Sequence, residues 1–491
     1  MQQKLEYSLD PDNWDELRAQ GHRMLDDIID YMQHLRERPV WQPAPDAVRN
    51  AFQEPLPHGP MPLPDVHQAF MQNILPYAIG NAHPGFMGWV QGGGTPVGML
   101  AEMLAAGINA NVGGRNQIPV EVERQILHWV RELFRFPESA SGIFVTGTSM
   151  ANLIGVLVAR TKALGVDIRS TGLQNSGKRL AAYTSVAAHA CVAQAFDLSG
   201  LGTDALRLIP TDAQGEMDIE ALKRVIAKDR EHGFTPFFVA GTAGTVDTGA
   251  VDKLSVLADI AEQEGLWFHI DGAYGALAVM APDIAPRLAG IERADSIAFD
   301  FHKWAQVQYD AGFILVRDGA LHEASFAAPV AYLARAERGM ATASPPWPCD
   351  FGPDLSRGFR ALKTWFAIKT YGIDGLGKVI SGGCALAQYL KQRIEAEPAL
   401  ELLAPVSLNI VCFGYRCREG EADRVNANLA IALQESGVAA PSTTMINGRL
   451  AIRAALFNHR STTQDVDALI EATLRFGADE VRNIEGYEKV A

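Results

Sequence analysis

Hydrophobic positions recur at helical spacing near the start of the chain. Residues 14–35 place apolar side chains every three or four positions, which is typical of one face of an amphipathic helix. Two proline-rich stretches follow, at 38–48 and 54–65, and they interrupt regular structure. The pattern predicts a helical arm over residues 1–80. Because such an arm has no core of its own, we expect it to pack on a partner subunit.

From residue 81 to residue 375, short apolar runs alternate with helical stretches such as 150–164 and 254–265. This alternation predicts a large α/β domain around a mostly parallel sheet. In such a sheet, ligands bind at the carboxyl ends of the strands. Seven runs are strand candidates: 142–147, 180–185, 205–210, 236–244, 266–274, 296–301 and 312–318.

The last part of the chain predicts a smaller domain over residues 376–491. Before it, residues 327–358 are irregular, and a long loop of this kind is often functional. A helical stretch over 358–372 comes next. Beyond it, alternating strand and helix patterns predict an α+β fold, with strands at 407–417 and 449–457 and a final helix at 462–476.

Composition and charge narrow the class of protein. The 491 residues are 48% hydrophobic and 20% charged, which is ordinary for a globular chain. The formal net charge is −14 and no run of lysine or arginine occurs, so we expect neither nucleic acid nor a membrane surface as a partner.

The cysteines and the N-terminal residues indicate the cellular compartment in which the protein works. The five cysteines are an odd number without a Cys-x-x-Cys pair, which argues against a disulfide framework and a zinc site and fits a reducing environment. The N-terminus is polar and acidic, unlike a signal peptide, and the longest apolar runs are too short to cross a bilayer. We therefore expect a cytoplasmic protein without a bound metal.

A lysine interrupts the apolar run at 295–316. His302 and Lys303 follow a strand candidate rich in apolar residues, and Trp304 comes directly after them. A buried ammonium is costly unless it is paired or loses its proton. Lys303 therefore either extends its amine to the surface or serves as a neutral amine, which attacks carbonyl groups.

Three further features of the large domain lie at strand ends or strand-to-helix turns. Gly147, Thr148 and Ser149 lie in such a turn, where backbone N–H groups and hydroxyls bind a phosphate or simply cap the helix. His189 begins another helix, where its ring can stack on an aromatic group or cap the helix. Asp271 ends an apolar strand, where a carboxylate needs a partner such as a pyridinium N–H, a helix cap or a structural ion pair.

The order of these features is more specific than any one of them. A phosphate turn, a stacking histidine, a strand-end aspartate and a lysine in an apolar strand match the phosphate, ring face, ring nitrogen and aldehyde of pyridoxal phosphate. We therefore expect Lys303 to bind this cofactor rather than to reach the surface.

Motifs along nearly the whole chain resemble those of the group II pyridoxal-phosphate amino-acid decarboxylases. They are HPGFMGW, VTGTSMANL, AAHACV, HIDGAYGA, FDFHKW and SRGFRALKTWFAIKTYGIDGL. The resemblance implies a type I aminotransferase-like fold, pyridoxal phosphate as cofactor, an amino-acid substrate, and a homodimer with active sites at the interface.

The resemblance also implies a role for each matching residue. Lys303 binds the cofactor covalently and Asp271 pairs with the ring nitrogen, which helps the ring accept the electrons left when carbon dioxide departs. The remaining cofactor-binding residues are His189 on the ring face, Gly147, Thr148 and Ser149 at the phosphate, His302 close to the phosphate, and Thr245 near the cofactor.

Protonation of Cα, the last step, has no obvious donor. Relatives use a tyrosine in a mobile loop for it. When the chain is aligned on the segment 357–360, this position falls at about Pro348, and Tyr332 matches the beginning of the loop instead. The donor is then missing or is supplied by His302, Lys303 or a water. A slowly protonated carbanion favours oxygen attack, which would give an aldehyde, ammonia and peroxide.

A third interpretation is transamination or carbon–carbon cleavage on the same fold, with Arg453 as anchor for a substrate carboxylate. A second departure from the family is Asp300, which stands where aromatic decarboxylases often carry asparagine near the phosphate. A carboxylate beside a phosphate is repulsive unless it is bridged or turned away, and the sequence does not explain it.

The substrate is expected to be an aromatic L-amino acid. The segment with His83 and Phe86 resembles the substrate-side strand of the family, and Phe86, Trp89 and Trp347 would furnish an aromatic pocket. The alternative is that these aromatic residues belong to the core. No arginine marks a site for a glutamate side chain.

Overall fold

The computed structural model describes residues 8–327, 338–342, 346–418 and 420–488. All seven strand candidates form strands of one sheet: β2 (Ser141–Val145), β3 (Leu180–Ser185), β4 (Leu206–Ile209), β5 (Thr235–Thr242), β6 (Trp267–Asp271), β7 (Ser296–Asp300) and β8 (Gly312–Val316). Their order is β2-β8-β7-β6-β5-β3-β4. β8 is antiparallel to both neighbours and the other pairings are parallel, so the predicted mostly parallel sheet is confirmed.

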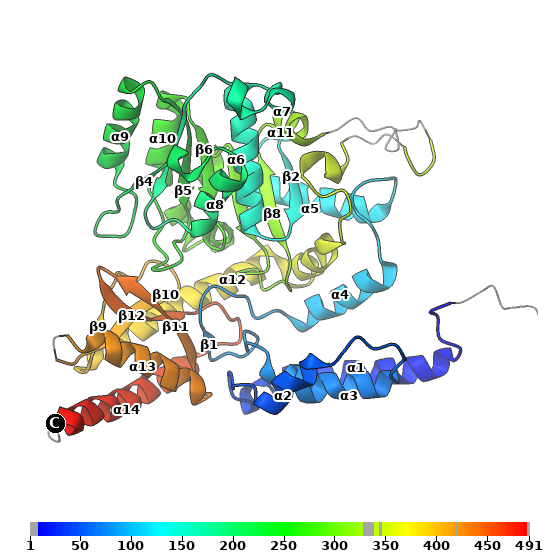
Figure 1. The fold of residues 1–491 in the computed structure, drawn as a ribbon, viewed down its shortest axis with the longest axis vertical. Coiled ribbons are helices and arrows are strands. Elements are labelled where there is room, and N and C mark those ends of the chain that lie inside the picture. The colour runs from blue at the N-terminus through cyan, green and yellow to red at the C-terminus, as the bar shows by residue number, and fades with distance from the viewer. Residues whose placement is uncertain (1–7, 328–337, 343–345, 419, 489–491) are drawn as a thin grey trace, which may run out of the picture.

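Helices cover both faces of this sheet (Figure 1). On one face lie α6 (Thr148–Leu164), α8 (Ala190–Leu198) and α11 (Gly319–Phe326); on the other lie α5 (Ile118–Phe134), α9 (Ile219–Glu231), α10 (Leu254–Glu264) and the start of α12 (Arg360–Ala396). Because both faces are covered, Ile143 and Val145 enter one core and Phe144 the other. This double burial is why the strands read as continuous apolar runs.

The small domain has a five-stranded sheet with two helices. It consists of β1 (Phe86–Met87), β9 (Leu400–Leu402), β10 (Ile410–Tyr415), β11 (Ala440–Ile446), β12 (Arg449–Ala455), α13 (Ala422–Glu435) and α14 (Thr463–Glu488), with strand order β1-β11-β12-β10-β9. The predicted strands became β10 and β12. Hydrophobic periodicity did not predict β1 and β9, which are too short to show it, nor β11, whose middle carries three hydroxyl residues; only the family resemblance pointed to a strand near Phe86.

Two elements of the structure join regions that the predicted domain limits separate. β1 falls in the range assigned to the large domain, but it pairs in parallel with β11 of the small sheet. The limit at 375–376 falls inside α12, which runs from one domain into the other and is interrupted at Gly372, whose φ is 67°. A pairing strand and a shared helix join the two domains. The amino-acid composition therefore does not change at the places where one domain passes into the other.

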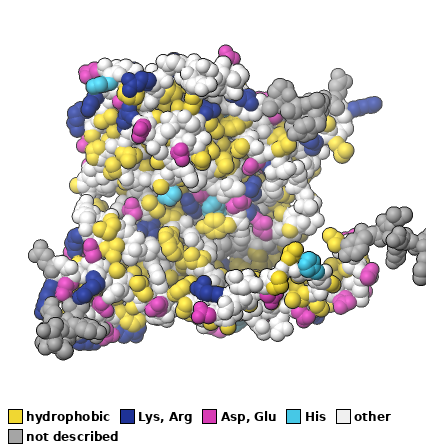
Figure 2. All heavy atoms as spheres, viewed as in Figure 1, with side chains coloured by type: hydrophobic (Ala, Val, Ile, Leu, Met, Phe, Trp, Pro, Cys, Tyr) yellow, Lys and Arg dark blue, Asp and Glu magenta, His cyan; other side chains and the backbone are white. Residues whose placement is uncertain are grey.

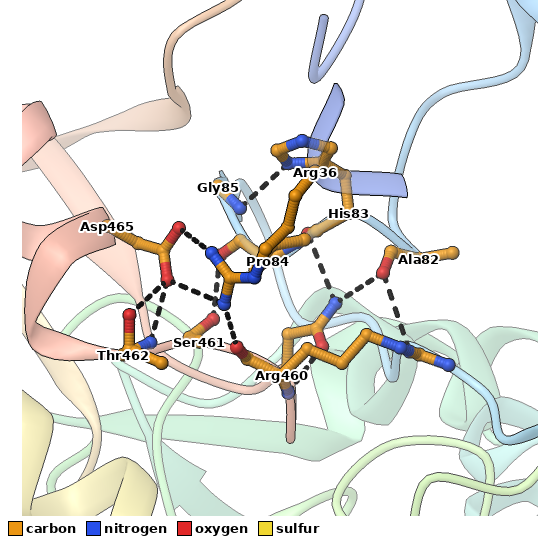
Figure 3. Close-up of polar contacts among 10 residues, drawn as sticks. Arg36, Ala82, His83, Pro84, Gly85, Arg460, Ser461, Thr462 and Asp465 are labelled. Atoms are coloured by element: carbon orange, nitrogen blue, oxygen red, sulfur yellow. Dashed lines mark hydrogen bonds and ion pairs between the residues drawn. The ribbon is translucent and has the colours of Figure 1, made fainter. Parts of the chain in front are cut away.

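The N-terminal arm is helical, as predicted. It contains α1 (Trp14–Gln33), α2 (Asp46–Asn50) and α3 (Leu63–Asn73), and it is followed by α4 (Pro96–Ile108). Figure 3 shows how Arg36 fixes the arm to the small domain: its guanidinium lies 2.9 Å from the Asp465 carboxylate and also donates to the backbone oxygen of Arg460. Packing of the arm on a partner subunit stays a prediction.

Short helical turns complete the description. They are α7 (Ile168–Thr171) and the 3-10 turns η1 (Leu35–Glu37), η2 (Ala51–Gln53), η3 (Leu75–Tyr77), η4 (Leu173–Asn175), η5 (Thr203–Ala205), η6 (Gly275–Met280), η7 (Ala285–Leu288), η8 (Ile291–Arg293) and η10 (Pro348–Phe351). Among the residues described, no helix is both long enough and apolar enough to pass through a membrane.

Candidate active site

Two carboxylates end neighbouring strands of the large sheet. Asp271 is the last residue of β6 and Asp300 the last residue of β7, and both are buried. β6 and β7 are parallel, so their carboxyl ends meet at one edge of the sheet. A Cβ built on Gly147, at the start of α6, would lie 3.8 Å from Asp300 Oδ1 and 3.8 Å from His302 Cε1. The predicted phosphate turn therefore borders the same place.

Lys303 lies in a turn beyond β7, so its predicted position within an apolar strand is wrong. The chain must reverse here to enter the antiparallel β8, and strand pairing ends at Asp300. The amine of Lys303 is 2.8 Å from Asp300 Oδ2, and its side chain is 19% exposed. This ion pair explains Asp300, which the sequence alone left without an account. The carboxylate faces a cation, which would offset its repulsion from a phosphate bound at the start of α6.

Asp271 is held by neutral donors rather than by an ion pair. Its Oδ1 accepts from the Ala273 N–H at 3.1 Å, and its Oδ2 accepts from Asn152 Nδ2 at 3.2 Å. Burial raises the pKa of the Asp271 carboxyl, and the charge of Lys303 lowers it in part. The two oxygens of this buried carboxylate can accept further hydrogen bonds. Such a group is a suitable partner for the N–H of a positively charged ring.

His189 both caps a helix and remains available for stacking. Its Nδ1 accepts from the Cys191 N–H at 3.2 Å at the start of α8, and its ring is exposed. The charge of His189 also lowers the pKa of Asp271, which places the imidazole near that carboxylate. The two interpretations of this residue are therefore compatible.

His302 is buried beside Asp300. Its Nδ1 accepts from the Ala311 N–H at 3.0 Å, so a neutral ring carries its proton on Nε2, which lies 3.6 Å from Asp300 Oδ2. Burial lowers the pKa of His302. The Tyr309 ring packs on this imidazole with ring centroids 4.3 Å apart.

The turn at the start of α6 is free of side-chain caps. Gly147 is the N-cap, so capping by Thr148 or Ser149, the alternative that the sequence left open, does not occur. Ser149 is exposed, and the buried Thr148 hydroxyl has no hydrogen-bond partner within the described structure. The first-turn N–H groups and these hydroxyls are the donors that a phosphate needs. Thr245 differs, because its hydroxyl accepts from Ala250 N–H at 3.0 Å inside its own loop.

The sequence model described as the pyridoxal-dependent decarboxylase conserved domain matches residues 45–416. The chain belongs to the pyridoxal-dependent decarboxylase family. It is therefore a carboxy-lyase with pyridoxal phosphate as cofactor. The described residues fit this group: an uncapped helix start for the phosphate, an exposed imidazole for the ring face, a buried carboxylate for the ring nitrogen, and a lysine amine for the aldehyde.

Relatives of this decarboxylase align over most of its length. An aromatic-L-amino-acid decarboxylase from Bacillus atrophaeus is 32% identical over 92% of this chain and 93% of its own. A phenylacetaldehyde synthase from Arabidopsis thaliana is 28% identical over 91% of this chain and 93% of its own. The crystal structure of Oryza sativa TDC with PLP and tryptamine superposes with a TM-score of 0.88 at 25% identity, covering 96% of this chain and 100% of that one.

The predicted substrate residues of the decarboxylase lie in different surroundings. Phe86 and Trp89 contact each other, with ring centroids 6.2 Å apart, and Trp89 is 53% exposed. His83 is buried and its Nδ1 accepts from Gly85 N–H at 2.9 Å, beside the arm in Figure 3. Trp347 is buried against Gly114, with the Arg115 guanidinium over its ring. Burial of Trp347 favours a core role, and its substrate role stays a prediction.

Arg453 does not serve as a carboxylate anchor in this structure. It is buried, and its Nε donates to the Val246 oxygen at 2.8 Å, while its Nη1 donates to the Trp89 oxygen at 2.9 Å and to Ser442 Oγ at 3.2 Å. These partners occupy its donors. The interpretation as a transaminase or carbon–carbon lyase therefore loses the residue on which it depended.

Sequence reasoning missed Asn152, Cys191 and Tyr309 near the site. Asn152 and Cys191 both approach Asp271 Oδ2, at 3.2 and 3.9 Å. Asn152 could have been found from the sequence, because it is a polar residue within a largely apolar helical stretch, and a buried polar side chain needs a partner. The sequence gives no comparable signal for Tyr309, because a loop brings it onto His302. Tyr332, the tyrosine weighed as a proton donor, lies outside the described residues.

Proposed function

We propose that this decarboxylase acts on an aromatic L-amino acid and releases the amine and carbon dioxide. The substrate class is supported by relatives named aromatic-L-amino-acid, tyrosine and tryptophan decarboxylases. The observation that carries the proposal is the meeting of Asp271, the Lys303–Asp300 pair and the start of α6 at one edge of the sheet.

The proposed roles follow from charge and position. Lys303 binds the cofactor aldehyde, and Asp300 fixes the lysine amine from 2.8 Å. When bound, the cofactor's protonated ring accepts the electron pair that the departing carboxylate leaves at Cα. Asp271 keeps the proton on the ring nitrogen, so it stabilises charge that develops during the reaction rather than the bound substrate.

The other proposed residues orient the cofactor. Gly147, Thr148 and Ser149 offer donors to its phosphate, and His189 covers its ring. His302 carries a proton on Nε2 near the phosphate side of the site, and Thr245 borders the cofactor. We propose His302 as one candidate donor of the proton to Cα, beside Lys303 and a water.

Two measurements test this proposal together. The reconstituted protein is reduced with borohydride and its labelled peptide is mapped, and carbon dioxide release is measured for each proteinogenic amino acid. We expect the label on Lys303, loss of the label in Lys303→Ala, and fastest release from aromatic amino acids. A colourless protein or a label elsewhere would overturn the cofactor role of Lys303. Release from non-aromatic amino acids alone would overturn the substrate class.

A second candidate product is an aldehyde, released with ammonia and peroxide. It is favoured by similarity to phenylacetaldehyde synthases from Arabidopsis thaliana and Petunia hybrida, which are 28% and 29% identical. Peroxide and ammonia measured against amine decide between the two products. A Tyr332→Phe variant adds a second arm: a shift from amine to aldehyde would identify this tyrosine as the Cα proton donor.

The proposed assembly is a homodimer with active sites at its interface. Support comes from apolar faces that one chain leaves uncovered. α4 exposes Leu100, Met103, Leu104 and Ile108 along one stripe, and Figure 2 shows a hollow between α4 and the arm. α1 likewise exposes Trp14, Leu17 and Met24. Large exposed apolar patches of this kind mark interaction sites.

A further inference from the structure

A stripe of polar side chains runs along one face of β6, underneath α6. Trp267, His269 and Asp271 alternate along the strand and so point to the same side. Ser296 of β7 is the register partner of His269, and Asn152 of α6 lies above. All of them are buried, with exposed fractions of 6% or less. Polar groups at this depth need a structural or functional reason.

Four hydrogen bonds join these side chains into one chain that ends at Asp271. Trp267 Nε1 donates to Ser296 Oγ at 2.8 Å, and Ser296 Oγ lies 2.7 Å from His269 Nδ1. His269 Nε2 lies 2.8 Å from Asn152 Oδ1, and Asn152 Nδ2 donates to Asp271 Oδ2 at 3.2 Å.

The direction of every donor in this chain is determined. An ionised Asp271 can only accept, so the Asn152 NH₂ group faces it and Asn152 Oδ1 accepts from His269 Nε2. With its proton on Nε2, the neutral His269 ring accepts at Nδ1 from the Ser296 hydroxyl, and the Ser296 oxygen accepts from Trp267 Nε1. Burial lowers the pKa of His269 to about 3, so its ring is neutral at pH 7.

We infer that Trp267, Ser296, His269 and Asn152 form a relay of positioning residues that orients Asp271 and holds it ionised against the cofactor's ring nitrogen. Every donor points toward the carboxylate, and aligned hydrogen bonds polarise one another in the same sense. The inference rests on the proposed role of Asp271. It adds that this role depends on residues that lie behind Asp271, away from the cofactor.

The packing around the relay is built to hold His269 in one orientation. A Cβ on Gly155 of α6 would lie 2.8 Å from His269 Cε1, so only glycine leaves room for the ring. Phe238 of β5 also stacks on this ring, with ring centroids 5.5 Å apart. A ring confined in this way keeps both nitrogens aimed at their partners.

The test uses the reconstituted holoenzyme with pyridoxal phosphate labelled with ¹⁵N in the ring. The variants are Asn152→Leu, Ser296→Ala, His269→Leu and His269→Gln. NMR of the ring nitrogen reports its protonation, cofactor affinity of the apoprotein is titrated separately, and circular dichroism checks folding. Ser141→Ala is the matched control, because Ser141 Oγ lies 2.8 Å from the buried His322 in the same domain, outside the relay.

We expect Asn152→Leu to move the ring-nitrogen signal toward the unprotonated position and to weaken cofactor binding about tenfold to a hundredfold, the cost of losing one hydrogen bond to a charged group. Ser296→Ala and His269→Leu should shift the signal in the same direction by less. His269→Gln keeps an N–H donor and should restore most of the signal, and Ser141→Ala should leave it unchanged.

The relay is overturned if folded Asn152→Leu and Ser296→Ala both keep the wild-type signal and affinity. An Asp271→Asn variant separates this failure from that of the proposed function. If Asp271→Asn changes the ring-nitrogen signal and the relay variants do not, the relay alone is wrong. If Asp271→Asn also leaves the signal unchanged, the role of Asp271 itself is wrong.

Discussion

Asp271 and Asp300 are two buried carboxylates at the ends of adjacent strands, and their partners give them different functions. Asp300 faces the Lys303 amine at 2.8 Å, so its charge is already matched. Among the described residues, the hydrogen-bond donors to Asp271 are an amide, a backbone N–H and a thiol, and burial raises its pKa more than the charges of Lys303 and His189 lower it. The unmatched carboxylate is the one suited to a protonated heterocycle, because that cation supplies the charge that its own surroundings lack.

Replacement of Asp271 by alanine tests this difference. We expect turnover to fall by orders of magnitude, because the ring loses the group that keeps it protonated during reaction. Borohydride should still label Lys303, since the lysine and Asp300 are untouched. Single-turnover kinetics and peptide mapping measure the two effects. Near-normal turnover in Asp271→Ala would contradict the role of Asp271.

At the scale of elements, the site depends on segments that pack directly against the turn carrying Lys303. Gly92, between β1 and α4, is such a contact: a Cβ there would run into the backbone oxygens of His302 and Lys303. Gln306 reinforces this packing, because its Oε1 accepts from Gly93 N–H at 3.0 Å and its Nε2 donates to the Phe457 oxygen at 2.8 Å. Residues from three distant parts of the chain thus fix one turn.

We therefore expect Gly92→Ala to displace the turn that carries Lys303, although Gly92 is not itself a proposed site residue. Overpacking typically costs about 1–3 kcal/mol, and here the obstructing atoms are backbone, so the lysine turn must shift. We expect a lower melting temperature and weaker cofactor binding, measured by calorimetry and titration. Gly382→Ala in α12 is the control, because a Cβ there meets nothing within 4 Å. Equal behaviour of the two variants would show that the close approach has no role.

At the scale of the whole molecule, one chain leaves apolar helix faces exposed while its two domain cores are closed. The apolar stripe on α4 and the helices of the arm lie on either side of the hollow seen in Figure 2. Burial of apolar surface contributes about 25 cal/mol per Å², which makes association of these faces favourable. A second copy of the chain would cover them.

The double variant Met103→Glu, Leu104→Glu tests this assembly. Charges placed on an apolar interface should convert a dimer to monomers, which sedimentation at several concentrations detects, and decarboxylation should fall with it. Ile431→Glu on α13 is the control, because Ile431 is 51% exposed and Met103 is 52% exposed. A wild-type chain that sediments as a fully active monomer would exclude the homodimer.

Buried neutral histidines predict how the stability of the molecule depends on pH. Burial lowers the pKa of His322 to about 3, well below the usual value of an exposed histidine. Between these values the unfolded chain binds a proton that the folded chain does not, so stability falls as pH drops below about 6.5. His322→Gln, which cannot titrate, should lose about 2 kcal/mol less than wild type between pH 7 and pH 5. Urea unfolding at both pH values measures this difference, and equal losses would contradict it.

The sequence by itself determined the elements of the large domain. All seven strands of its sheet overlap the predicted runs to within one residue at the start, because strands buried on both faces carry continuous apolar sequence that local patterning reveals. It also indicated the cofactor, since an aspartate at the end of one strand and a lysine just beyond another match the ring nitrogen and the aldehyde of pyridoxal phosphate. Hydrophobic patterning did not reveal β1 and β9, because short pairing strands carry no pattern of their own.

Only the tertiary structure decided which groups pair with which. Asp300 and Lys303 are close in sequence, but their ion pair forms because the chain turns sharply after β7. Arg453 lost its predicted role when backbone oxygens of distant segments filled its donors. The relay behind Asp271 joins α6, β6 and β7. Hydrogen bonds and charges act over a few ångströms in space, and a sequence records neighbours along the chain but not those brought together by folding.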